Sequence, residues 1–177
     1  IFGQPGTYED KLSGVIEEIA RVADVYGVRI IVRDPDDGGL RTMVRGQMEW
    51  EALPALQQVQ GLSLMAFESG EAVLANDYSS HPNAEQMFIE RGVKSSISLP
   101  IKADDKIIAV AGIASDELNH FNPERVRLLT AIVDGLGPLL ENARLDQDLL
   151  DSNSQLSEAL ETLKATQEHL VHQERLS

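Results

Sequence analysis

The chain has 177 residues, of which 42% are hydrophobic and 25% charged, a composition typical of one folded domain with an appendage. It carries 15 Lys and Arg against 29 Asp and Glu, and this net charge of −14 argues against nucleic acid and anionic membrane surfaces as partners. It contains no Cys, which excludes disulfides, a thiolate nucleophile and cofactors tethered through sulfur. No run of 18 apolar residues occurs, so the sequence predicts no membrane-spanning helix. We expect a cytoplasmic protein that binds neither a cofactor nor a metal.

The first third of the chain predicts a helix followed by a β-hairpin. Apolar residues recur at helical spacing over residues 7–23, where Thr7 is a weak N-cap. Residues 28–33 and 40–45 alternate and flank turn-forming residues, which is typical of a hairpin. Residues 48–59 predict a short helix or an irregular loop.

The middle of the chain predicts three more strands and a helix, and a long helix follows. The strands cover residues 72–76, 95–101 and 106–114, and the short helix covers residues 83–91. Asn122 is placed to cap the long helix, with Pro123 at its first position. The order of these elements favours an α+β fold, an antiparallel sheet flanked by helices with a long C-terminal helix.

The C-terminal 33 residues predict a coiled coil. A heptad seam, with steps of four and three residues, consists of Leu149, Asn153, Leu156, Leu160, Leu163, Gln167 and Leu170. The simplest partner for this seam is a second copy of the chain, and Asn153 at an inner position favours a parallel two-stranded pair. We therefore divide the chain into a domain of residues 1–144 and a dimeric coil of residues 145–177.

Two features predict an irregularity where the domain meets the coil. A second seam, shifted by one residue, is formed by Leu136, Leu140, Ala143, Gln147 and Leu150. The two seams cannot both be continuous, which predicts a disturbed supercoil between Leu145 and Asn153. Pro138, preceded by the helix-weakening Gly135 and Gly137, predicts a kink or a break.

Several short motifs in this order resemble the GAF domain family over residues 8–145. They are residues 61–73 (GLSLMAFESGEAV), 76–78 (NDY), His81-Pro82, 92–101 (GVKSSISLPI), 121–123 (FNP) and 141–145 (ENARL). The sequence departs from the family at Ala109, where many members carry Gly, and at the Gly-rich interruption of residues 135–138. The resemblance implies a sensor domain with a cavity for a small molecule.

The resemblance also places a candidate ligand pocket. Its expected walls are Asp77, His81, Met87, Phe88, Ser96 and Ser98. Small Ser side chains that alternate with Ile97 and Leu99 suit such a space. His81 has two interpretations, a ligand of haem or of a bound molecule, and a plain turn residue before Pro82. A closed hydrophobic core without any ligand is equally compatible with the sequence.

Other chemistries of GAF-like proteins lack their residues here. Bilin attachment and the free methionine sulfoxide reductases of this fold need cysteines, which the chain lacks. Asn119-His120-Phe121 is followed by Arg125 in place of the signature of cyclic-nucleotide-binding members, which argues against that ligand. His169 and His172 fit a solvated coil face better than a metal site. No catalytic constellation is present, so we expect that this stretch is not an enzyme.

Residues 165–177 resemble the lead-in to the dimerisation helix of sensor histidine kinases, whose phosphoacceptor His would lie further on. The resemblance implies a regulatory sensor module of a two-component protein, which relays the binding of a ligand or partner through a parallel coiled coil to an output domain. The alternatives are a ligand-free dimerisation scaffold, or the sensor of a diguanylate cyclase or a phosphatase.

Overall fold

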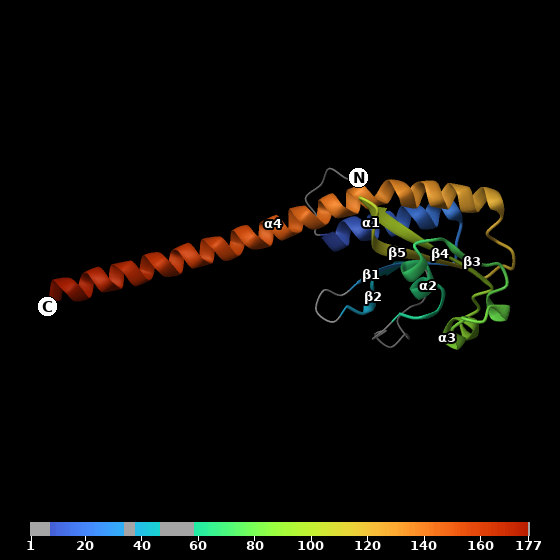
Figure 1. Ribbon diagram of the computed structural model, residues 1–177, viewed down its shortest axis with the longest axis horizontal. Helices are drawn as coiled ribbons and strands as arrows, with labels where there is room; N and C mark the ends of the chain where they lie inside the picture. The colour runs from blue at the N-terminus through green and yellow to red at the C-terminus, as the bar shows by residue number, and fades with distance from the viewer. Residues whose placement is uncertain (1–7, 34–37, 47–58, 177) are drawn as a thin grey trace. The chain divides into compact units, whose positions relative to one another are not determined.

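The computed structural model describes residues 8–33, 38–46 and 59–176, and the chain forms two compact units, Ile1–Glu141 and Asn142–Ser177 (Figure 1). The elements in chain order are α1 (Tyr8–Ala23), β1 (Gly27–Arg33), β2 (Leu40–Gly46), α2 (Gly61–Ser69), β3 (Val73–Ala75), the 3-10 helix η1 (Tyr78–Ser80), α3 (Gln86–Glu90), β4 (Ser95–Ala103), β5 (Lys106–Ser115) and α4 (Pro123–Leu176). The predicted Thr7 cap and residues 48–58 of the predicted loop lie outside the described residues.

The first unit is built on one five-stranded sheet, in the order β2-β1-β5-β4-β3, in which every neighbouring pair is antiparallel. The β4–β5 hairpin turns at Asp104 and Asp105, which both have positive φ, the geometry of a type I′ turn. This sheet with its flanking helices confirms the predicted α+β fold class.

Alternation along the strands gives the sheet two different faces. One face packs against α1 and the first turns of α4, and its core includes Ile97 and Leu99 of β4 together with Leu136 and Leu140 of α4. The opposite face is covered by α2 and by the segment that carries η1 and α3 (Figure 1). Helix α2 was not predicted from the sequence.

Helix α4 begins as predicted. The side-chain oxygen of Asn122 accepts a hydrogen bond of 2.9 Å from the N–H of Arg125, and the helix starts at Pro123. The helix continues through Pro138, so the predicted break there is wrong. Pro138 removes only one backbone hydrogen bond, and the buried side chains of Leu136 and Leu140 hold this part of the helix in the core.

Gly137 is required by the packing of α4 against the end of β4. A Cβ atom at this position would overlap the carbonyl oxygen of Lys102, a backbone atom that has little freedom to move. A Cβ at Gly135, in contrast, would meet nothing within 4 Å. The two glycines therefore have different roles, since only Gly137 permits a close approach.

The second seam predicted from the sequence has another explanation. Leu136 and Leu140, its first two members, belong to the core of the first unit, so they do not form a coil interface. Leu150, its last member, is 65% exposed, so the disturbed supercoil between Leu145 and Asn153 stays a prediction.

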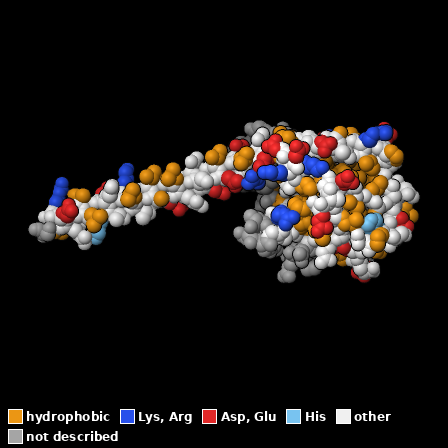
Figure 2. Space-filling model, viewed as in Figure 1, with side chains coloured by type: hydrophobic (Ala, Val, Ile, Leu, Met, Phe, Trp, Pro, Cys, Tyr) orange, Lys and Arg blue, Asp and Glu red, His pale blue; other side chains and the backbone are white. Residues whose placement is uncertain are grey.

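The second unit consists of helical residues of α4, and hydrophobic side chains recur along its exposed surface (Figure 2). The leucines of the predicted seam are between 55% and 63% exposed, and they are Leu149, Leu156, Leu160, Leu163 and Leu170. No helix within the described ranges is both long and apolar enough to span a bilayer.

Candidate ligand-binding site

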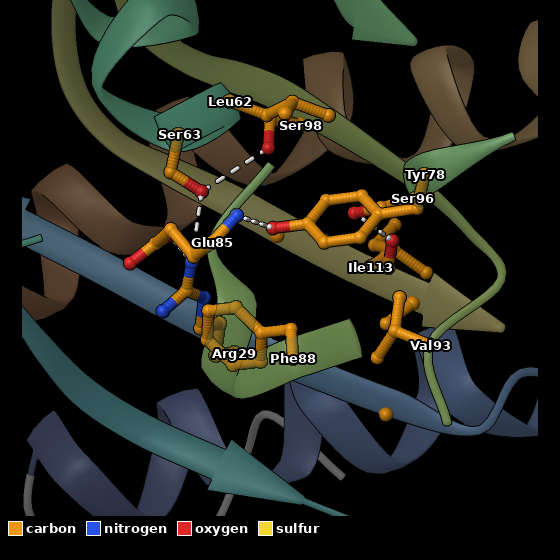
Figure 3. A pocket seen from close by; sticks show the side chains of 13 residues that line it. Arg29, Leu62, Ser63, Tyr78, Glu85, Phe88, Val93, Ser96, Ser98 and Ile113 are labelled. Atoms are coloured by element: carbon orange, nitrogen blue, oxygen red, sulfur yellow. Dashed lines mark hydrogen bonds and ion pairs between the residues drawn. The ribbon is translucent and has the colours of Figure 1, made fainter. Parts of the chain in front are cut away.

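A small cavity lies between the sheet and the elements that cover its α2 face (Figure 3). The space open to the centre of a water molecule is about 20 Å³, enough for about one water-sized group. The cavity is lined by Gly27, Arg29, Leu62, Ser63, Tyr78, Glu85, Phe88, Val93, Ser96, Ser98, Gly112, Ile113 and Ala114.

Arg29 is the charged side chain that the sheet contributes to this cavity. It alternates on β1 with Val28 and Ile30, which face the other core, so its side chain points toward α2. Its cross-strand partner on β5 is Gly112, where a Cβ would lie 3.1 Å from Nε of Arg29. The glycine therefore gives the arginine side chain room to lie across the sheet.

The guanidinium of Arg29 is buried with few partners. Nη2 lies 3.4 Å from Oγ of Ser63 and 3.9 Å from Oε1 of Glu85, and the guanidinium stacks 4.7 Å from the ring centroid of Phe88. Nη1 has no hydrogen-bond partner among the described residues. Arg29 is only 7% exposed, so bulk water has little access to this donor. Burial lowers the pKa of Arg29, and the carboxylate of Glu85 offsets this only in part.

Four residues bring hydroxyl groups to the polar wall, and the hydroxyl of Ser96 donates a hydrogen bond of 3.0 Å to the carbonyl oxygen of Ile113. The hydroxyls of Ser63 and Ser98 lie 3.1 Å apart, and the Tyr78 hydroxyl accepts a hydrogen bond of 3.1 Å from the N–H of Glu85. Burial raises the pKa of Tyr78, so its proton stays in place at neutral pH. These groups come from α2, β4 and η1, and they converge beside Arg29 (Figure 3).

Glu85 forms the boundary between this cavity and the surface. Its side chain is 20% exposed, and it also lines an outer hollow of about 440 Å³ with Gly61, Asn83 and Met87. Burial raises the pKa of its carboxyl, while the nearby charge of Arg29 acts in the opposite direction with a smaller effect. The carboxylate is therefore an imperfectly satisfied partner of the arginine.

The structure brings together three of the six residues predicted to line the pocket. Phe88, Ser96 and Ser98 line the cavity. Met87 faces the outer hollow beyond Glu85.

The other two predicted residues, Asp77 and His81, do not line the cavity. The carboxylate of Asp77 accepts hydrogen bonds of 2.7 and 2.9 Å from the hydroxyls of Ser80 and Ser79, and these bonds lower its pKa. Nδ1 of His81 accepts the N–H of Asn83 at 3.2 Å, within a turn.

Sequence reasoning missed the two charged residues of the cavity, two of the four residues that bring a hydroxyl group to its wall, and the glycine beside Arg29. They are Arg29, Ser63, Tyr78, Glu85 and Gly112. One signal was available, because a Gly in the middle of a β-branched strand often marks a close approach by another group.

The described residues show no group of three or more His, Cys, Asp or Glu side chains that could hold a metal ion. With a buried cation, hydroxyl donors and an aromatic ring, the arrangement suits the binding of a small ligand.

Comparison with protein families gives a match to the GAF domain over residues 7–141, which corresponds to the first unit and its core. The chain belongs to the GAF domain family. Domains of this family are in general regulatory sensor modules. A comparison with curated proteins gave no match.

Solved GAF domains share this fold at low sequence identity. The GAF domain of a phosphoenolpyruvate-protein phosphotransferase from Coxiella burnetii is 17% identical, with a TM-score of 0.70 over 82% of this chain and 89% of that one. A domain of a putative two-component sensor histidine kinase from Sinorhizobium meliloti is 13% identical, with a TM-score of 0.61 over 79% and 94%.

The fold also occurs in an enzyme. The type II free methionine-R-sulfoxide reductase from Thermoplasma acidophilum is 20% identical, with a TM-score of 0.65 over 76% of this chain and 93% of that one. Domains of a phosphotransferase and of a sensor kinase, and a reductase, are therefore similar to this GAF domain in fold.

Proposed function

We propose that this chain is the sensor module of a signal-transduction protein, of the sensor histidine kinase type. In this proposal the GAF domain binds a small molecule in the cavity beside Arg29, and a parallel coiled-coil dimer of α4 relays the event to an output domain. The resemblance of residues 165–177 to the lead-in of a kinase dimerisation helix supports this output.

The observation that carries the proposal is the exposed leucine seam in the second unit. An isolated helix of this length with leucines at every heptad is marginal in water, and its apolar stripe is stabilised by a partner helix. Leu156 and Leu163 are 60% and 56% exposed in the single chain. A second copy would bury both, and Asn153 would favour a parallel pair in register.

Two leucines on α4 allow a matched test of this dimer. Leu156 lies on the seam that runs from Leu149 to Leu170, whereas Leu150 belongs only to the shifted second seam, and their exposed fractions in the single chain are 60% and 65%. We expect Leu156→Asn to weaken dimerisation at least tenfold and Leu150→Asn to change it much less, as measured by sedimentation equilibrium. A chain that stays monomeric at high micromolar concentration, or equal effects of the two substitutions, would contradict the relay.

The small cavity favours one second candidate, a dimerisation scaffold that binds no ligand. Its space of about 20 Å³ admits roughly one water-sized group unless Glu85 moves. A thermal-shift screen with small metabolites separates the two functions, because a ligand that binds the folded state raises the melting temperature. The scaffold predicts no specific shift.

A further inference from the structure

We propose that the cavity binds the carboxylate group of a small organic acid, which replaces Glu85 as the partner of Arg29. The inference rests on the proposed function, since it names the chemical class of the ligand that the sensor would detect. It concerns binding at this site alone and does not depend on the dimer or on the output.

The cavity has an excess of hydrogen-bond donors. Nη1 of Arg29 offers two N–H groups without a partner among the described residues. The Tyr78 hydroxyl accepts the N–H of Glu85, and the described residues leave its own proton unassigned. Whichever of Ser63 and Ser98 donates to the other, one hydroxyl proton of the pair is also left. A ligand group that fits this wall is therefore an acceptor with negative charge.

Charge leads to the same ligand class. The titratable side chains that line the cavity are Arg29, Tyr78 and Glu85, and Tyr78 is neutral. Oε1 of Glu85 is 3.9 Å from Nη2, too far for a hydrogen bond, so the buried cation lacks a well-placed anion in this structure. A buried charge without close partners is costly, and a ligand carboxylate that accepts two N–H bonds would remove this cost.

The size of the space selects the group that enters it. About 20 Å³ admits one water-sized group, which suits an oxygen of a planar carboxylate better than a tetrahedral phosphate. The remainder of the acid would occupy the outer hollow of about 440 Å³, which borders the same Glu85 side chain. Entry then requires Glu85 to turn outward, and its 20% exposure places it at the surface where such a movement is possible.

The test is a chemical-shift titration of the full chain with sodium acetate and sodium pyruvate at constant ionic strength. Acetamide serves as the neutral isostere of acetate, and sodium phosphate as the tetrahedral anion. The side-chain Nε–H signal of Arg29 reports on the guanidinium directly. We expect saturable binding of one carboxylate per chain, no binding of acetamide, and weaker binding of phosphate than of acetate.

Arg33 provides a matched control for Arg29. It lies on the same strand, stacks 4.6 Å from the ring of Phe67 and is exposed, and it does not line the cavity. We expect Arg29→Met to weaken acetate binding at least roughly tenfold, the effect of losing a charge-assisted hydrogen bond. Arg33→Met should leave the affinity within about twofold.

Glu85 gives a test that still applies if Arg29→Met fails to fold. Glu85→Gln removes the competing carboxylate, so we expect it to bind acetate about tenfold more tightly than the parent chain. Glu90→Gln should have no effect, because Glu90 is exposed at the C-terminal end of α3, the helix that Glu85 precedes.

Three outcomes would overturn the inference. The first is that neither the parent chain nor the Glu85→Gln variant binds a carboxylate. The second is that the Glu85→Gln variant binds acetate more weakly than the parent chain does. The third is that phosphate binds more tightly than acetate. If carboxylates fail while another metabolite raises the melting temperature, the carboxylate inference is wrong and the sensor function stands. If no compound binds and the chain is monomeric, both are wrong.

Discussion

The contrast between Gly137 and Gly135 gives a sharp prediction about how α4 is held on the sheet. A Cβ at Gly137 would overlap the carbonyl oxygen of Lys102 and would lie 3.4 Å from the N of Ala103. Because both obstacles are backbone atoms, Gly137→Ala forces α4 away from β4, and the buried Leu136 and Leu140 move with it. Gly135→Ala meets nothing within 4 Å.

The expected magnitudes follow from two opposing effects. Overpacking at a rigid contact costs about 3 kcal/mol. The alanine gains about 1 kcal/mol over glycine in a helix interior. Gly137→Ala should therefore lower the free energy of unfolding by about 2 kcal/mol, and Gly135→Ala should raise it by about 1 kcal/mol. For a chain of this length these changes correspond to melting temperatures lower by about 4–8 °C and higher by about 2–4 °C.

The assay is urea unfolding followed by intrinsic fluorescence at one fixed protein concentration. All Phe, Trp and Tyr residues lie at or before Phe121, so this signal reports on the GAF domain and not on the second unit. If Gly137→Ala is as stable as the parent chain, or if the two alanine variants change stability equally, then α4 does not approach β4 as closely as described.

Three further predictions concern the coil, a turn and the cavity. Asn153→Leu should tighten the dimer measured by sedimentation, because it replaces a polar side chain at an inner position of the seam. It should also reduce the effect of a ligand on the output. Unchanged regulation in a tighter dimer would contradict the relay. Replacing Asp104 and Asp105 by Asn and Gly should raise the free energy of unfolding by roughly 1 kcal/mol, because both positions have positive φ; a loss of stability would contradict the type I′ assignment. Because burial raises the pKa of Glu85 above its unfolded value, the folded chain binds a proton that the unfolded chain releases, and stability falls as pH rises from the ordinary Glu value through the raised one. Glu85→Gln should remove this fall and be more stable at neutral pH in urea titrations; a less stable variant would mean that pairing with Arg29 outweighs burial.

Much of the fold could be predicted because its signals are local. The β4–β5 hairpin follows from alternation, and the start of α4 follows from Asn122 and Pro123. Helix α2 was missed because residues 62–67 are mostly apolar, without the polar stripe that marks an amphipathic helix. The helix is covered on more than one side, and that depends on tertiary packing.

The candidate site was predictable only in part, for a related reason. Ser96 and Ser98 alternate with apolar residues, which indicates a second face of β4. Arg29 alternates with apolar residues in the same way, and this pattern is typical of a solvent-facing position. What makes Arg29 a cavity residue is the cover that α2 places over this face, and alternation alone cannot show whether a face is covered.

One strand serves both sides of the sheet. Ser96 and Ser98 of β4 line the cavity. Their neighbours along the strand, Ile97 and Leu99, lie on the other face, in the core that also contains Leu136 of α4. In the proposed sensor, a ligand that binds beside these serines would therefore contact a strand whose next residues pack in the core that holds α4. Only the backbone of β4 separates the cavity from the core that holds α4. The proposed signal would therefore need no chain of intermediate side chains.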